Sequence, residues 1–191
     1  MLRILTFLTL SILATTTSFA KTTQYQINSR NANVKVDWTL SASSKIYHAR
    51  LSQVNGIVTM DPEQDMQNKI VVNIPINTLD AHNILLTHEL KSRRFFDELL
   101  FPVATFRSSR IVSTGAGHYR VLGTLQIKDV QRPVILEADV MPANPLPDVP
   151  KTLILNAKTT ISRSSFGMDS YLFLVSDSIG VDIRLEANMI Q

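Results

Sequence analysis

The chain has 191 residues, no cysteine, and 19 Lys and Arg against 16 Asp and Glu, which gives a formal net charge of +3. Without a thiol the chain cannot form a disulfide framework, a thiolate zinc site, an iron–sulfur cluster or a cysteine nucleophile. Its basic residues are spread along the sequence, whereas nucleic-acid-binding domains usually concentrate them in a dense stripe. We therefore expect no nucleic-acid partner.

The first twenty residues have the organisation of a secretory signal peptide. Arg3 makes the start positive, residues 4–14 are an apolar run of the length of a signal core, and Ser18-Phe19-Ala20 matches the small-x-small cleavage pattern. We expect cleavage after Ala20, export to a bacterial periplasm, and a single mature domain over 21–191 with no stable membrane insertion. The alternative is that this segment stays in place as an N-terminal anchor.

Most of the mature chain alternates apolar and polar residues with the two-residue period of β-strands. Asn55-Gly56, inside a long extended region, fits either a hairpin turn or a bulge that bends one strand. The stretches that we predict as strands are 23–27, 33–40, 46–60, 69–76, 103–111, 119–127, 134–140, 153–162 and 179–189.

This pattern predicts an all-β protein of about eight strands. A sandwich and a barrel are both compatible with the alternation alone. Long strands favour a closed antiparallel barrel, because closure removes the unpaired edges that they would otherwise expose. A barrel of about eight strands either fills with side chains or encloses one slim ligand.

Residues 78–100 interrupt the β pattern and predict a short helical insertion, with its helix over 83–92. Leu86 and Leu90 fall on one helical face, and Glu89 precedes Arg93 by four positions, a favourable order for an ion pair. Four of the eight phenylalanines of the chain follow within or just after this insertion. We expect the segment to bury its aromatic side chains at the mouth of the barrel.

Catalytic and metal-binding patterns are absent from the sequence. The four histidines (His48, His82, His88 and His118) lack the i, i+4 spacing of a helical zinc site, and there is no Gly-x-Ser-x-Gly elbow. Asp177, Asp182 and Glu186 fall on the polar side of the last strand, where a solvated face is the simplest interpretation. We predict no catalytic residue, no metal ligand, no required cofactor and no enzymatic activity.

Two segments resemble the signatures of a known family, the YceI-like polyisoprenoid-binding proteins. The first is Leu90-Lys91-Ser92-x-x-Phe95-Phe96-Asp97-x-x-x-Phe101-Pro102-x-x-x-Phe106-x-Ser108. The second is Tyr119-x-Val121-x-Gly123-Thr124-Leu125-x-Ile127-Lys128-x-Val130-x-Arg132-Pro133-Val134. Phe166-Gly167-Met168 and Val175-Ser176-Asp177 match the closing segment, so the resemblance extends over 23–189.

The resemblance implies a lipocalin-like barrel that holds an isoprenoid-type lipid, such as a quinone tail or a polyprenyl chain. It implies an apolar site, for which we predict these ligand contacts: Val36, Trp38, Leu85, Leu90, Phe95, Phe96, Phe101, Phe106, Tyr119, Val121, Leu125, Leu136, Phe166, Met168, Val181 and Ile183. Lys91, Arg93 and Arg94 are candidate contacts for a head group, with a solvated basic face as the alternative.

Compared with the family that it resembles, the chain diverges in its polar residues. The family usually has an Arg-Asp pair where this chain has Leu86-Thr87. It usually has a histidine at the position of Glu89, and another at the position of Trp38. Two other functions stay open: a lipid-free barrel that acts in protein interaction or stress response, and, third, an enzyme on an isoprenoid substrate. The sequence leaves open whether the protein is a monomer or a homodimer.

Overall fold

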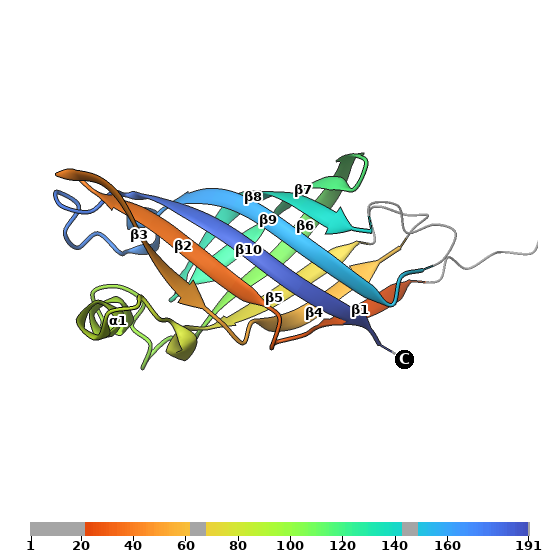
Figure 1. Cartoon of the computed structure of the whole chain (residues 1–191), viewed down its shortest axis with the longest axis horizontal. Coiled ribbons are helices and arrows are strands. Elements are labelled where there is room, and N and C mark those ends of the chain that lie inside the picture. The colour runs from red at the N-terminus through yellow and green to blue at the C-terminus, as the bar shows by residue number, and fades with distance from the viewer. Residues whose placement is uncertain (1–21, 62–67, 143–148, 191) are drawn as a thin grey trace, which may run out of the picture.

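The computed structural model of the chain describes residues 22–61, 68–142 and 149–190 (Figure 1). Ten strands and one α-helix account for most of them. The predicted signal peptide lies outside the described residues. The strands are β1 (Thr23–Ile27), β2 (Asn33–Leu40), β3 (Ser43–Leu51), β4 (Asn55–Met60), β5 (Lys69–Pro75), β6 (Val103–Gly115), β7 (His118–Ile127), β8 (Val130–Met141), β9 (Thr152–Ser162) and β10 (Ser178–Met189). The helices are α1 (Ile84–Lys91) and two 3-10 turns, η2 (Ile76–Thr78) and η3 (Ser164–Phe166).

The strands form a closed antiparallel barrel of eight rows. The hydrogen-bonded order runs β1-β4-β5-β6-β7-β8-β9-β10, and β10 pairs back onto β1 through Tyr25 and Met189. β10 continues past β1 and pairs with β2 through residues 180–184, so β1 and β2 share one row. β3 and β4 share the next row of the barrel. The predicted barrel of about eight strands is confirmed.

One long predicted strand, 46–60, is divided. It breaks at residues 52–54, where Gln53 takes a positive φ of 54°, and Asn55 and Gly56 begin β4. The Asn-Gly pair is therefore not a hairpin turn. Gly56 is required at its position, because its φ is 151° and a Cβ there would lie 2.0 Å from the carbonyl oxygen of Val71. The break leaves β3 paired to β2 but, among the described residues, not to β5.

The predicted helical insertion is present, and the helix is shorter than expected. Asn83 caps α1, its Oδ1 accepting a 3.0 Å hydrogen bond from the amide of Leu86. The helix ends at Lys91, so Arg93 leaves the helical face and the predicted Glu89–Arg93 pair does not form. Glu89 pairs with Arg94 instead, at 3.1 Å. Within the described ranges, no helix has both the length and the hydropathy to cross a membrane.

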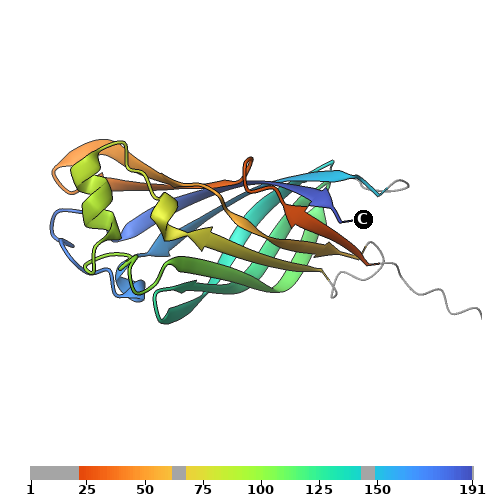
Figure 2. The ribbon, with the colours of Figure 1, turned by 90° about the horizontal axis from the view of Figure 1, so that it is seen from below.

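The two ends of the barrel differ. Figures 1 and 2 place α1, the β2–β3 hairpin and the loop before β10 at one end, and the C-terminal end of β10 at the other. We call these the α1 end and the closed end. At the closed end Tyr25, Val58, Leu153 and Ala187 are all buried. The side chains of that end fill the barrel interior.

Candidate ligand-binding cavity

The α1 end of the barrel contains a cavity of about 310 Å³. This volume is at the lower end of the range of small-molecule sites, roughly 300–1,000 Å³. None of the lining residues comes from β1 or β4, the strands that close the other end. The cavity therefore reaches from the middle of the barrel to α1.

The wall is built from residues of eight strands, all of them except β1 and β4, because every second side chain of a strand points into the barrel. A β7 glycine makes room for one of these side chains: a Cβ at Gly123 would lie 2.5 Å from the ring of Phe106 on the neighbouring strand. The strand residues of the wall are Val34, Val36, Trp38, Leu51, Ile70, Val72, Ile74, Ala104, Phe106, Val121, Leu125, Ile127, Val134, Leu136, Ala138, Leu155, Ala157, Thr159, Ile161, Ile179, Val181, Ile183 and Leu185.

The helix and two loops cover the mouth of the cavity. Leu86, Glu89 and Leu90 line it from one face of α1, as expected for residues three and four positions apart. Phe95 and Phe96 follow from the loop after the helix. The remaining lining residues are Ile76 of η2 and, near or in the loop before β10, Arg163, Met168, Tyr171 and Val175.

A small polar cluster joins the two loops at the mouth. The Nη1 atom of Arg94 donates to Glu89 Oε1 at 3.1 Å and to the hydroxyl of Tyr171 at 2.8 Å. The ring of Tyr171 stacks on Phe95, with centroids 6.3 Å apart. Glu89 and Tyr171 both line the cavity, so this cluster places polar groups at its mouth.

A buried arginine organises the loop before β10. Arg163 is 3% exposed, and burial lowers the pKa of its guanidinium below the usual value. Its nitrogens donate to four backbone carbonyls of the loop, and its guanidinium carbon lies 5.9 Å from the centroid of the Phe95 ring. The accepting carbonyls are those of Met168, Ser170, Val175 and Ser176. Arg163 thus ties the loop that carries Met168 and Tyr171 to β9.

Asp177 holds the other side of the same loop. Its carboxylate accepts hydrogen bonds from Ser162 Oγ at 2.6 Å and from the Ser164 amide at 2.8 Å. The hydrogen bond from Ser162, followed by that from the Ser164 amide, lowers the pKa of Asp177. The interpretation of Asp177 as part of a merely solvated face is wrong, because the carboxylate is engaged on both oxygens.

The acidic residues of β10 itself have separate surface partners. Asp182 lies 3.6 Å from the amine of Lys158, and Glu186 accepts hydrogen bonds from the side chains of Asn28 and Asn31. In the described ranges, no three His, Asp or Glu side chains gather in an arrangement that could hold a metal ion.

Comparison with known proteins identifies the family. A family model described as the YceI-like domain matches residues 25–187. The chain belongs to the YceI-like family. It is 26% identical to Protein YceI of Salmonella newport over 179 residues, covering 93% of each chain.

Solved structures share the YceI-like fold. Burkholderia cenocepacia BcnA superposes with a TM-score of 0.72 at 22% identity, over 82% of this chain and 96% of that one. A polyisoprenoid binding domain from Saccharophagus degradans, implicated in plant cell wall breakdown, gives 0.66 at 12% identity, over 87% and 98%.

Most of the residues predicted as ligand contacts lie on the wall of this YceI-like cavity. The ligand contacts themselves stay predictions. The predicted residues that line the cavity are Val36, Trp38, Leu90, Phe95, Phe96, Phe106, Val121, Leu125, Leu136, Met168, Val181 and Ile183.

Four predicted contacts lie outside the lining. Leu85 is 79% exposed, because α1 turns Leu86 rather than Leu85 toward the barrel. Phe166 is 1% exposed and belongs to the packed core. Tyr119 packs against the core near the β6–β7 turn, and Phe101 is half-buried in the loop before β6. Alternation indicates the face of a side chain but not its depth along the barrel.

The three basic head-group candidates also lie outside the lining. The Lys91 amine donates to the Asn77 carbonyl at 2.6 Å, and Arg93 is exposed. Arg94 touches the site through Glu89 and Tyr171.

The sequence interpretation missed several lining residues of two kinds. The first kind is apolar residues of β5 and β9, which the alternation of apolar and polar residues in these strands could have indicated. They are Ile70, Val72, Ile74, Leu155, Ala157 and Ile161. The second kind is polar: Glu89 shares a helical face with Leu86, whereas Arg163 and Tyr171 belong to no periodic pattern, and only the fold brings the three together.

Proposed function

We propose that this YceI-like protein is a non-catalytic carrier that holds the apolar chain of an isoprenoid-type lipid inside its barrel. The observation that supports this most is the chemistry of the cavity wall. Apart from Trp38, only Glu89, Thr159, Arg163 and Tyr171 among its lining residues have polar side chains, and the rest are aliphatic residues, phenylalanines and Met168.

Such a wall recognises a ligand by burial rather than by hydrogen bonds. Each CH₂ group removed from water contributes about 0.8 kcal/mol, so a few isoprene units offset the cost of ordering the chain. A quinone tail and a polyprenyl chain both fit this chemistry. The Saccharophagus degradans domain of the same fold, described as polyisoprenoid binding, supports the proposal by analogy of fold.

We further propose that a polar head group, where the lipid has one, lies beside Arg94. Arg94 is the basic candidate that contacts lining residues, through Glu89 and Tyr171. The Lys91 amine is already held by the Asn77 carbonyl, and no lining residue is within hydrogen-bonding contact of Arg93. A quinone or phosphate oxygen beside Arg94 would accept a hydrogen bond from its guanidinium.

The proposed location is the periplasm, after cleavage of the signal peptide at Ala20. The residues that support it are the positive start, the apolar run and the small-x-small site at 18–20. Comparing the N-terminal sequence of protein purified from the periplasmic fraction with that of cytoplasmic protein tests the location. A mature protein that begins at Met1 would contradict it.

The carrier function is tested by extracting natively purified protein with organic solvent and analysing the extract by mass spectrometry. We expect an isoprenoid-type lipid in stoichiometric amount. Phe96→Asp places a charge on the wall and should remove the lipid, whereas Ile135→Asp, on the exposed outer side of β8, should not. An empty wild-type protein that also takes up no quinone or polyprenol would contradict the proposal.

A further inference from the structure

Large exposed apolar side chains gather at the α1 end. They lie at the start of α1, in the loop between α1 and β6, and in the loop before β10. Leu99 is 99% exposed and Phe173 is 76% exposed, values that a folded protein seldom shows for such side chains. We call the following set the mouth rim: Ile84, Leu85, Leu99, Leu100, Leu172 and Phe173.

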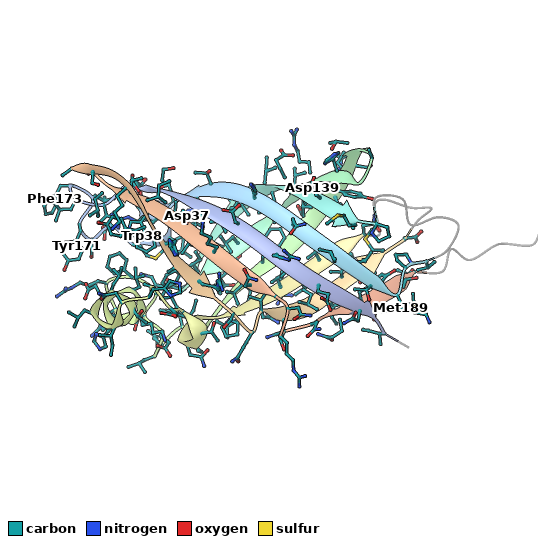
Figure 3. All side chains as sticks on the ribbon, viewed as in Figure 1. Asp37, Trp38, Asp139, Tyr171, Phe173 and Met189 are labelled. Carbon is teal, nitrogen blue, oxygen red and sulfur yellow. The ribbon has the colours of Figure 1, made fainter. Side chains whose placement is uncertain are left out.

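The mouth rim borders the cavity. Leu85 is exposed beside Leu86, which lines the cavity, and Leu172 is exposed beside Tyr171, which also lines it. Figure 3 shows Tyr171 and Phe173 together at the α1 end, with Met189 at the opposite end. The apolar surface of the wall therefore continues outward onto the rim.

Charge on the same segments favours an anionic partner. Over residues 41–47, 84–103 and 168–175, the exposed charged side chains are the cations Lys45, Arg93 and Arg94 and a single acid, Asp169. Lys91, Glu89, Asp97 and Glu98 on these segments are partly buried. The Arg94–Glu89 ion pair neutralises both of its members, which leaves Lys45 and Arg93 against Asp169 as the exposed charges.

We propose that the mouth rim docks the protein on a phospholipid surface. Leucine and phenylalanine side chains enter the boundary between head groups and acyl chains, while Arg93 and Lys45 meet anionic head groups. An apolar ligand then passes between the bilayer and the cavity without entering water. The passage rests on the proposed carrier function, whereas docking requires no ligand.

A flotation assay of ligand-free protein with phosphatidylcholine vesicles, with and without phosphatidylglycerol, tests docking. We expect the wild type to float with the vesicles, more strongly when phosphatidylglycerol is present. The double variant L99S/F173S should bind at least about tenfold more weakly, since each substitution removes most of one large apolar side chain from the contact. Both positions are exposed, so the barrel should fold normally.

The matched control is the double variant I57S/I135S, which removes two exposed apolar side chains from the outer wall of the barrel. It should float as the wild type does. Wild-type protein that fails to float, or equal flotation of the rim and wall variants, overturns the proposal. A homodimer in solution that L99S/F173S dissociates also overturns it, because the rim then serves a second copy of the chain.

Docking and carrying fail separately. Phe96→Asp should empty the cavity and leave flotation unchanged. L99S/F173S should still contain lipid, detected by solvent extraction, but should exchange that lipid slowly with vesicles. Arg93→Gln should lower flotation about fivefold on vesicles containing phosphatidylglycerol and leave it unchanged on phosphatidylcholine alone. An equal effect on both vesicle types contradicts the assigned role of this charge.

Discussion

The closed end and the α1 end of the barrel are held together in different ways. At the closed end, β1 pairs with both β4 and β10, and residues such as Tyr25 and Leu153 fill the interior. At the α1 end, β3 has no partner strand on the side of β5 among the described residues, and α1 lies at that end of the barrel (Figure 2). One end supplies stability, and the other keeps a cavity and a mouth.

The largest effect should come from the closed end. Leu153→Ala leaves a void among fully buried side chains, and we expect it to lower the free energy of unfolding by about 2–5 kcal/mol. Urea unfolding followed by circular dichroism measures this. Ligand content per folded molecule should stay at the wild-type level. A loss of ligand without a loss of stability would contradict the division between the two ends.

Arg163→Met should affect both stability and ligand retention. The variant leaves four loop carbonyls without their donor. Only the bond to the Met168 carbonyl is fully buried, so water can replace the donor at the other three and we expect a cost of about 1–3 kcal/mol. We expect the loop before β10 to detach and ligand to dissociate faster. Arg184→Met, on the exposed side of β10, is the control. Unchanged dissociation of a fluorescent lipid would show that the loop does not retain the ligand.

Asp177→Asn should destabilise the protein in a pH-dependent way. The native hydrogen bonds lower the pKa of Asp177, so its contribution is present above the unfolded pKa of about 3.9 and is lost as the pH falls through the lower native pKa. We expect a cost of about 1 kcal/mol at neutral pH, limited by partial exposure to solvent. Unfolding curves at pH 7 and pH 3 measure it. A difference from wild type that persists unchanged at pH 3 would contradict this assignment.

The smallest effect on stability should come from Arg94→Gln. The Arg94–Glu89 pair is exposed, and such pairs contribute about 0–1 kcal/mol. We still expect ligand to dissociate a few-fold faster, because the substitution weakens the link between the two mouth loops. Stopped-flow dissociation of a fluorescent lipid measures it, with Arg93→Gln as the control. Equal rates for both variants would mean that the cluster does not restrain the mouth.

The two-residue periodicity of the sequence predicts the barrel well, but it predicts only some of the residues that line the cavity. The alternation of β10 was enough to place Val181 and Ile183 on the inner face, where both line the cavity. Tyr119 has the same signal but lies beyond the cavity, since depth depends on strand register and tilt. Register is a property of the assembled sheet rather than of one strand.

Side chains outside the strands were harder to predict. Leu85 and Leu86 are chemically identical neighbours, and the rotation of α1 about its axis determines which one lines the cavity. Arg163 donates its side-chain hydrogen bonds to backbone carbonyls, which every residue type carries, so the sequence does not indicate these partners. Its structural role depends on its burial, and the burial of a single arginine cannot be predicted from the sequence pattern.

The missing pairing between β3 and β5 has a consequence for how the family can diversify. Two backbone hydrogen bonds, between Arg50 and Asp80, tie β3 to the segment before α1. Residues 84–101 belong to no strand, so a change of sequence or length there should alter the entrance without shifting a strand register. Under the proposed carrier function, this segment is where we expect selection for ligands of different width to act.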